Sequence, residues 1–189
     1  SAGNYEVTLV VTTDKGCQHT EKQKVVVYAK PTAAFLPLMG CISDAVVFQD
    51  KSTVAASSSI VAWAWNFGDG TTAAVQHPSH KYSQPGTYQV KLLVTTVDGC
   101  TAELAQALTI VHAPVADAGP DQKPVCGVTY TVLQGNKPPH GTGLWTIVAG
   151  TGGQLADPTN PKSGFTGKME ENYRLRWTVS NSPCAAATD

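Results

Sequence analysis

The stretch that decides the fold reads "AWAWNFGDGTT", residues 62–72, and it raises one question. Asp69 stands between two glycines, where it could act as a catalytic or metal-binding carboxylate or could fasten a turn. Trp63, Trp65 and Phe67 alternate along the run, so they fall on one face of a strand. An Asp-Gly pair follows at once, and this pair favours tight turns. We therefore interpret the run as a core-facing strand that ends in a structural turn.

A catalytic, metal-binding or phosphate-binding role for this stretch and its neighbours would need further residues that the sequence does not place nearby. A catalytic carboxylate needs a second acid or a nucleophile beside it, and a calcium ion needs several oxygen ligands. Only Asp69 is available for either role. His77 and His80 stand three apart, but Pro78 disfavours the helix that would make them half of a metal site. The glycine-rich runs "HGTG" and "AGTGGQ" lack the following helix of a phosphate-binding loop. We predict no catalytic, metal or cofactor site, and a protein that is not an enzyme.

Composition narrows the class of protein further. The chain has 189 residues, of which 42% are hydrophobic and 14% charged, which is enough apolar material for packed cores and too little charge for disorder. A net charge of −1 without a basic cluster argues against a nucleic-acid partner or an anionic membrane surface. No apolar run approaches the roughly 18 residues of a membrane span, so membrane insertion is not expected.

An internal repeat is the second strong signal. The segments "GNYEVTLVVTTDKGC" (residues 3–17) and "GTYQVKLLVTTVDGC" (residues 86–100) are identical at nine positions, with an offset of 86 − 3 = 83. Both continue through another apolar strand to a proline, Pro31 and Pro114. A period of this length fits a tandem array of small sandwich domains. Residues 1–30 are therefore predicted to be the last two strands of a domain that begins upstream.

The five cysteines carry a prediction of their own. None stands in a CxxC pair, so a zinc site is not expected, and scattered cysteines in such a chain indicate an oxidising, extracellular setting. Because Cys17 takes the place of Cys100 in the repeat, its partner would lie upstream. The other four are predicted to pair within domains, Cys41 with Cys100 and Cys126 with Cys184, which closes loops of similar length (100 − 41 = 59; 184 − 126 = 58).

Alternating apolar residues predict strands along nearly the whole chain. In "YQVKLLVTT" and in "YRLRWTV" every second residue is apolar, from Tyr88 to Val94 and from Tyr173 to Val179. Further strands are predicted at 33–38, 45–49, 60–67, 104–111, 129–133 and 144–148, punctuated by the turn signals "GDG", "QPG", "VDG" and "DPTNP". No segment carries a helical stripe. The fold class predicted is all-β, with sandwiches favoured over barrels.

These motifs resemble the PKD domain, an immunoglobulin-like β-sandwich. Within residues 31–113, "WNFGDGT", "HPSHKY" and "PGTYQVKLLV" stand in the family's order. Residues 114–189 lack the first of these, but "GLWTIVAGTGG" and "YRLRWTVSNSPC" are similar to the Ig-like repeats that accompany PKD copies, with Trp145 as the core tryptophan. The resemblance implies structural roles for the motif residues, which are Trp65, Phe67, Gly68, Asp69, Gly70, His80, Tyr82, Gly86 and Tyr88.

The resemblance also implies an organisation and a function. The expected domains are residues 1–30 (the end of a truncated PKD-type domain), 31–113 (a PKD domain) and 114–189 (a PKD-like domain truncated at its last strand). The cysteine-bearing repeats look like those of Bacteroidota surface proteins, including gliding-motility adhesins exported by the type IX secretion route. We therefore expect a stalk segment of an extracellular, cell-surface adhesin, with neighbouring repeats, surface polysaccharide or other cell-surface proteins as partners. The alternative is a carbohydrate-binding or spacer module of a secreted polysaccharide- or protein-degrading enzyme.

Overall fold

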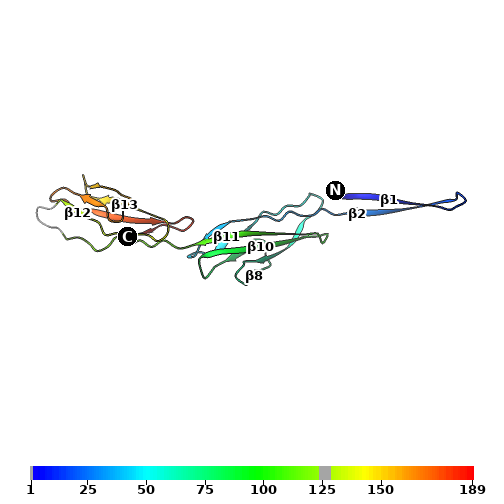
Figure 1. Cartoon of the computed structure of the whole chain (residues 1–189), viewed down its shortest axis with the longest axis horizontal. Coiled ribbons are helices and arrows are strands. Elements are labelled where there is room, and N and C mark those ends of the chain that lie inside the picture. The colour runs from blue at the N-terminus through cyan, green and yellow to red at the C-terminus, as the bar shows by residue number, and fades with distance from the viewer. Residues whose placement is uncertain (1, 124–128) are drawn as a thin grey trace. The chain divides into compact units, whose positions relative to one another are not determined.

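The computed structural model describes residues 2–123 and 129–189, and throughout this part of the chain the regular structure is strand, without a helix. The predicted all-β, immunoglobulin-like fold class is confirmed. The strands, labelled in Figure 1, are β1 Gly3–Thr12, β2 Gln18–Val27, β3 Phe35–Leu36, β4 Met39–Cys41, β5 Val46–Val47, β6 Gln49–Asp50, β7 Ile60–Asn66, β8 Thr72–Ala73, β9 Ser79–His80, β10 Gly86–Thr96, β11 Thr101–Val111, β12 Tyr130–Val132, β13 Thr142–Ala149, β14 Gln154–Leu155, β15 Gly164–Thr166, β16 Arg174–Ser180 and β17 Ala187–Thr188.

The chain divides into two compact units. The first unit comprises Ser1–Leu38, Val47–His80 and Tyr88–Ala107. The second unit comprises Met39–Val46, Lys81–Thr87 and Leu108–Asp189. The domain bounds 1–30, 31–113 and 114–189 that the repeat suggests stay a prediction.

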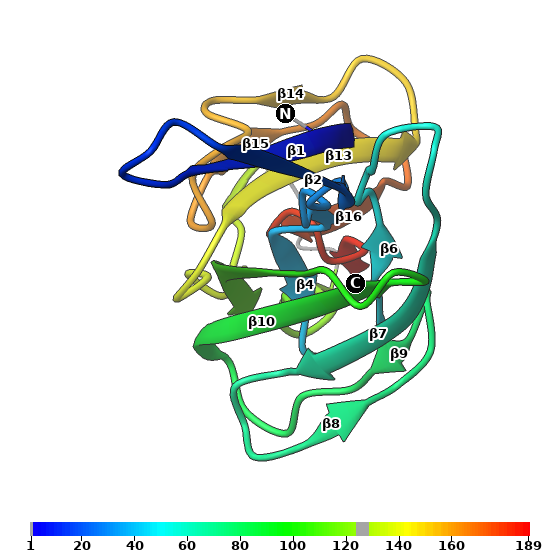
Figure 2. The same cartoon turned by 90° about the vertical axis from the view of Figure 1, so that its right-hand side faces the viewer.

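The largest sheet has five strands in the order β4-β11-β10-β7-β8, and Figure 2 shows β7 beside β10. β7 and β10 are antiparallel, with Trp65 opposite Leu92. The alternation predicted along β10 is present, because Val90, Leu92 and Val94 are all fully buried. These branched and apolar side chains suit a pleated surface with one face inward, which is why the period-2 pattern forms a strand here.

Four aromatic rings make up the centre of the first unit. Phe35 and Phe48 come from the region of the short ladders β3–β6 and β5–β9, while Trp65 and Phe67 come from β7 and the residue after it. The ring centroids of neighbouring pairs lie 5.2 to 6.4 Å apart, in tilted, edge-on or stacked arrangements. Aromatic pairs in this range stabilise a core beyond their buried area. Two layers of strands therefore close over an aromatic core, as the immunoglobulin-like prediction requires.

The second unit contains a sandwich of two three-stranded sheets, β12-β15-β14 and β13-β16-β17. Its core is the buried set Leu133, Trp145, Phe165, Trp177 and Val179. Trp145 and Trp177 face each other across the β13–β16 pair, with ring centroids 5.1 Å apart. The Trp177 indole N–H donates to Asn136 Oδ1 at 2.9 Å. The prediction that Trp145 is a core tryptophan agrees with its exposed fraction of 3%.

β1 and β2 form a regular antiparallel hairpin in which every described residue is exposed (Figure 1, blue). Its turn matches the β10–β11 turn in detail: Thr13 N–H donates to Cys17 O at 2.9 Å, as Thr96 N–H donates to Cys100 O at 2.9 Å. Gly16 and Gly99 both have a φ of 81°. The two hairpins are therefore copies of one structural element, as the sequence repeat predicts.

The predicted cysteine pairing is wrong. Cys41 is bonded to Cys184, with their Cα atoms 4.9 Å apart, and Cys100 is a free thiol. The reason lies in strand register. Cys41 ends β4 and lies opposite Val111, the last residue of β11, whereas Cys100 precedes the first residue of that 11-residue strand. Strand ends that far apart, roughly 33 Å at ~3.3 Å per residue, cannot be joined by a disulfide. Cys126, the predicted partner of Cys184, lies outside the described residues.

Candidate functional site

The GDG turn after β7 is organised around Asp69. Its Oδ1 accepts hydrogen bonds from the Thr71 hydroxyl (2.6 Å) and the Thr71 N–H (3.1 Å), and its Oδ2 lies 2.6 Å from His80 Nε2. The His80 ring stacks on Phe67 with centroids 4.3 Å apart. Gly68 is the first residue of the turn and has a φ of 83°, and a Cβ there would lie 2.7 Å from the backbone oxygen of Gln89.

The lowered pKa of Asp69 agrees with a structural role for its carboxylate. Burial raises the pKa of Asp69, but the Thr71 hydroxyl, His80 and the Thr71 backbone N–H together outweigh it, so the pKa is lowered from its usual value. A carboxylate held in its charged form by several donors is a poor general acid near neutral pH.

Histidine, aspartate and threonine together suggest a nucleophilic triad, but the geometry excludes one. In a triad the carboxylate and the hydroxyl bind opposite nitrogens of the imidazole. Here Asp69 Oδ2 and Thr71 Oγ1 both approach the same nitrogen, His80 Nε2, at 2.6 and 3.3 Å. Thr71 also donates its proton to Asp69. The cluster therefore fastens the turn to β9, and these three side chains are not arranged as a triad.

A second carboxylate, Asp50 at the end of β6, ties down the tryptophan that alternation had placed in the core. Asp50 Oδ2 accepts from the Trp63 indole N–H at 2.7 Å and from Gln76 Nε2 at 3.2 Å, and Oδ1 accepts from Ser52 N–H at 2.9 Å. Burial raises the pKa of Asp50, but these hydrogen bonds, the Ser52 ones foremost, lower it below its usual value. Trp63 itself is half-buried. The alternation of the sequence predicts correctly which face of β7 carries Trp63. It predicts neither how deeply the side chain is buried nor that the indole binds Asp50.

The four tryptophans differ in how much of each side chain is exposed to solvent. Trp65, Trp145 and Trp177 are exposed by 1%, 3% and 0%. Trp63 is half-buried and its indole N–H is bound to Asp50. A flat sugar-binding surface needs an aromatic ring face open to solvent, which the three buried tryptophans do not provide.

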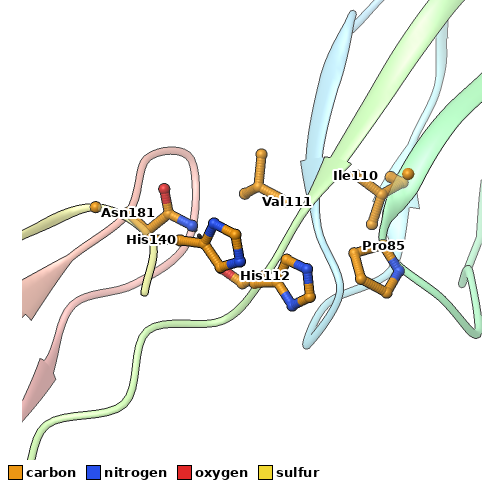
Figure 3. A pocket seen from close by; sticks show the side chains of 8 residues that line it. Pro85, Ile110, Val111, His112, His140 and Asn181 are labelled. Atoms are coloured by element: carbon orange, nitrogen blue, oxygen red, sulfur yellow. Dashed lines mark hydrogen bonds between the residues drawn. The ribbon is translucent and has the colours of Figure 1, made fainter. Parts of the chain in front are cut away.

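A shallow pocket of about 400 Å³ in the second unit brings together two histidines that the sequence keeps 28 residues apart. Figure 3 shows the His112 and His140 rings facing each other near Asn181. Their centroids lie 4.3 Å apart, nearly parallel, and Asn181 Nδ2 donates to His112 O at 2.7 Å. Sequence reasoning missed this pair, because residues in separate loops carry no mutual spacing signal. Stacked imidazoles without a carboxylate beside them do not make a catalytic dyad.

The glycine runs of the second unit also have structural roles. Gly150, at the end of β13, has a φ of 96°, and a Cβ there would lie 2.8 Å from the backbone oxygen of Asn172. Gly143 lies under the Trp177 ring, where a Cβ would come within 2.1 Å of Cζ2. Tyr173 spans the neighbouring loop: its hydroxyl donates to Thr151 O at 2.8 Å and accepts from Lys168 N–H at 2.9 Å. These glycines allow strands, rings and loops to pack closely.

Within residues 2–123 and 129–189, no three side chains of histidine, cysteine, aspartate or glutamate gather closely enough to hold a metal ion. In the same residues, no helix is long and apolar enough to cross a membrane. Of the remaining motif residues, Tyr82 is buried, and Gly86 begins β10 two residues before the half-buried Tyr88.

Comparison with known proteins finds a family match in the central segment of the chain. Residues 28–111 match the family described as the PKD domain. This segment is therefore similar to a PKD-type, immunoglobulin-like domain. Collagenase ColA of Bacillus cereus is 26% identical over 145 residues, covering 76% of this chain and 14% of that protein. A microbial collagenase of Vibrio alginolyticus is 32% identical over 71 residues, covering 38% of this chain and 9% of that protein. The chain thus spans a small part of the length of these relatives.

Among solved structures, the PKD1 domain of Vibrio anguillarum Epp is similar at a TM-score of 0.37 and 27% identity, covering 43% of this chain and 93% of that one.

Proposed function

We propose that this chain is a non-catalytic spacer and accessory segment of a larger exported enzyme that degrades protein. The observation that carries the proposal is the 145-residue similarity to collagenase ColA, which covers 76% of this chain. That stretch is longer than the PKD match at residues 28–111. The similarity therefore reaches beyond the segment that matches the PKD domain.

The geometry of the two candidate carboxylates supports a scaffold role for the segment. The carboxylate oxygens of Asp69 and Asp50 take part in hydrogen bonds that hold loops in place. The stacked His112 and His140 lack an acid partner in the described pocket. On this proposal the catalytic residues of the whole protein lie outside these 189 residues, and the segment sets the distance between the catalytic part and whatever the protein grips.

The disulfide supports an extracellular location. A bond between Cys41 and Cys184 persists in an oxidising compartment and is rare in reducing ones. Export through the type IX route, and a place in a gliding-motility adhesin, stay predictions of the Bacteroidota resemblance. The collagenase relatives favour the enzyme context over the adhesin stalk.

The buried tryptophans favour a spacer over a carbohydrate-binding module. We expect the purified chain to stay in the supernatant when insoluble cellulose, chitin or xylan is sedimented. Retention on one of these polysaccharides would instead support the carbohydrate-binding alternative, and the surface would then have to use other side chains than the tryptophans.

The decisive experiment uses the full-length protein. Residues 28–111 are replaced by a flexible glycine-serine linker, together with C184S so that no thiol is left by the loss of Cys41. We expect the hydrolysis of a small soluble peptide to be unchanged and the release of fragments from insoluble collagen to fall. The C184S substitution alone is the control. A full-length protein that cleaves neither substrate would refute the enzyme context.

A further inference from the structure

The Cys41–Cys184 bond joins positions 143 residues apart. Cys41 ends β4, inside the segment that matches the PKD domain, and Cys184 lies in the turn between β16 and β17, beyond that segment. Both cysteines belong to the second compact unit. The bond therefore ties one repeat of the chain to the hairpin turn of the repeat that follows it in sequence.

The turn that holds Cys184 has counterparts earlier in the chain. Cys184 N–H donates to Asn181 O at 2.9 Å, as Gly99 N–H donates to Thr96 O at 2.9 Å. Cys184 thus lies in a turn equivalent to the one that contains Cys100. Within that turn it takes the place of Gly99, one position before Cys100. The same turn recurs between β1 and β2, where it carries Cys17.

Cys100 has the setting of Cys184 but not its bond. It is a free, partly exposed thiol, and its backbone N–H is held by Thr96 Oγ1 at 3.1 Å. Cys41 cannot be its partner, because β11 separates the two along its full length. If the link between successive repeats is regular, the partner of Cys100 is the counterpart of Cys41 in the preceding repeat.

The β1–β2 hairpin indicates that such a repeat precedes. Val7, Leu9 and Val11 are 53%, 62% and 53% exposed, while their counterparts on β10 are fully buried. A hairpin with this apolar face uncovered is at best marginally stable alone. We expect this apolar face to be covered by the earlier strands of the same repeat, which belong to the part of the chain ahead of Ser1.

We propose that Cys100 forms a disulfide with a cysteine of that preceding repeat, so that each repeat is bonded to the hairpin turn of the next. The offset places the partner at 41 − 83 = −42, about 40 residues ahead of Ser1, at the end of a strand beside β2. This inference does not rest on the proposed enzyme context. It assigns an oxidised state to Cys100 from an observed bond between equivalent positions.

The chemistry balances as a thiol–disulfide exchange. The Cys100 thiolate attacks one sulfur of an oxidant that carries its own disulfide, and the upstream cysteine then attacks the mixed disulfide. One S–S bond forms in the chain, and two S–H bonds are lost from it. The two electrons pass to the oxidant's disulfide, and the two protons reach it directly or through the solvent, so that the oxidant leaves as a dithiol.

The test is a peptide map of the full-length protein in its exported form. The protein is alkylated with N-ethylmaleimide without reduction, digested and analysed by mass spectrometry. We expect one cross-linked peptide pair to join Cys41 with Cys184, and a second to join Cys100 with a cysteine from the predicted upstream position. Alkylated Cys100, Cys100 joined to Cys41, or an upstream sequence without a cysteine would each overturn the proposal.

Two variants sharpen the test. C100S should leave the upstream cysteine alkylated and the Cys41–Cys184 pair intact. C184S is the matched control, because it should leave Cys41 alkylated and the Cys100 cross-link intact. If C100S disturbs folding, the map of the unmodified protein still decides the question.

Discussion

Gly143 is where the core of the second unit can be tested most sharply. It lies on β13 opposite Val179, and a Cβ at this position would come within 2.1 Å of Trp177 Cζ2 and 2.3 Å of Cη2. Carbon atoms in favourable contact stay about 3.5–4.0 Å apart. G143A therefore requires a shift of more than 1 Å by the ring or the strand, by this comparison.

Trp177 has little freedom to make that shift. Its side chain is fully buried, its indole N–H is bonded to Asn136, and its ring packs against Trp145. Overpacking of a core costs about 1–3 kcal/mol, and loss of the indole hydrogen bond adds about 1 kcal/mol. We expect G143A to lower the free energy of unfolding by about 2–4 kcal/mol. For a unit of this size that corresponds to a fall in Tm of roughly 10–20 °C.

The assay is urea and thermal unfolding followed by near-ultraviolet circular dichroism. L144A is the control, because Leu144 neighbours the glycine on the same strand and is 44% exposed; we expect little change there. W177F removes the clashing part of the ring, so the double variant G143A/W177F should be more stable than the sum of the single effects by at least about 1 kcal/mol. Unfolding midpoints of G143A equal to those of the unsubstituted chain, or additive effects in the double variant, would refute this account of the core.

Three further predictions concern polar groups and the disulfide. Because the folded-state pKa of Asp69 is lowered, its carboxylate stabilises the fold fully above the unfolded pKa of about 3.9 and loses that contribution as the pH falls through the folded-state value. The stability difference between the unsubstituted chain and D69N, taken from urea midpoints across pH 2 to 6, should therefore shrink toward acid pH; a constant difference contradicts the role of the charge. D50N sets an amide donor against the Trp63 and Gln76 donors and should cost about 1–3 kcal/mol, read from the same midpoints; an unchanged midpoint contradicts the hydrogen-bond network. The C41S/C184S variant should lose about 2–5 kcal/mol in urea unfolding, and a reductant should destabilise the unsubstituted chain but not the variant; equal sensitivity of both to reductant contradicts the bond.

Local patterns predicted the long strands well, for a physical reason. Every second residue from Tyr88 to Val94 is apolar, as in a strand with one buried face, so β10 and its inward face follow from the sequence alone. The short strands did not follow as simply. The strand predicted at 33–38 is reduced to Phe35–Leu36, and the one predicted at 45–49 is divided between β5 and β6. Their pairing is decided by distant partner strands, which local periodicity does not record.

The errors at Cys41 and Trp63 have the same origin. The predicted pairs within domains closed loops of similar length. The length of a loop, however, does not determine at which end of a β-sandwich each cysteine lies. The parallel register of β4 on β11 decides that, and it is a tertiary fact. For Trp63, alternation gives the face of the strand but not its depth, and the buried acceptor Asp50 lies 13 residues away. Both required knowledge of which segments meet.

Gly68 and Gly150 set a limit on how far such repeats can diverge. Each ends the tryptophan strand of its own sandwich with a left-handed φ, and each is pressed against a backbone oxygen, that of Gln89 or Asn172. A backbone atom cannot be trimmed by substitution, so neither place admits a side chain. The WNFGDG spelling is absent around Gly150, and the family match ends at residue 111. A search for distantly related repeats should therefore align this glycine first, because its steric requirement is kept where the neighbouring residues of the motif are not.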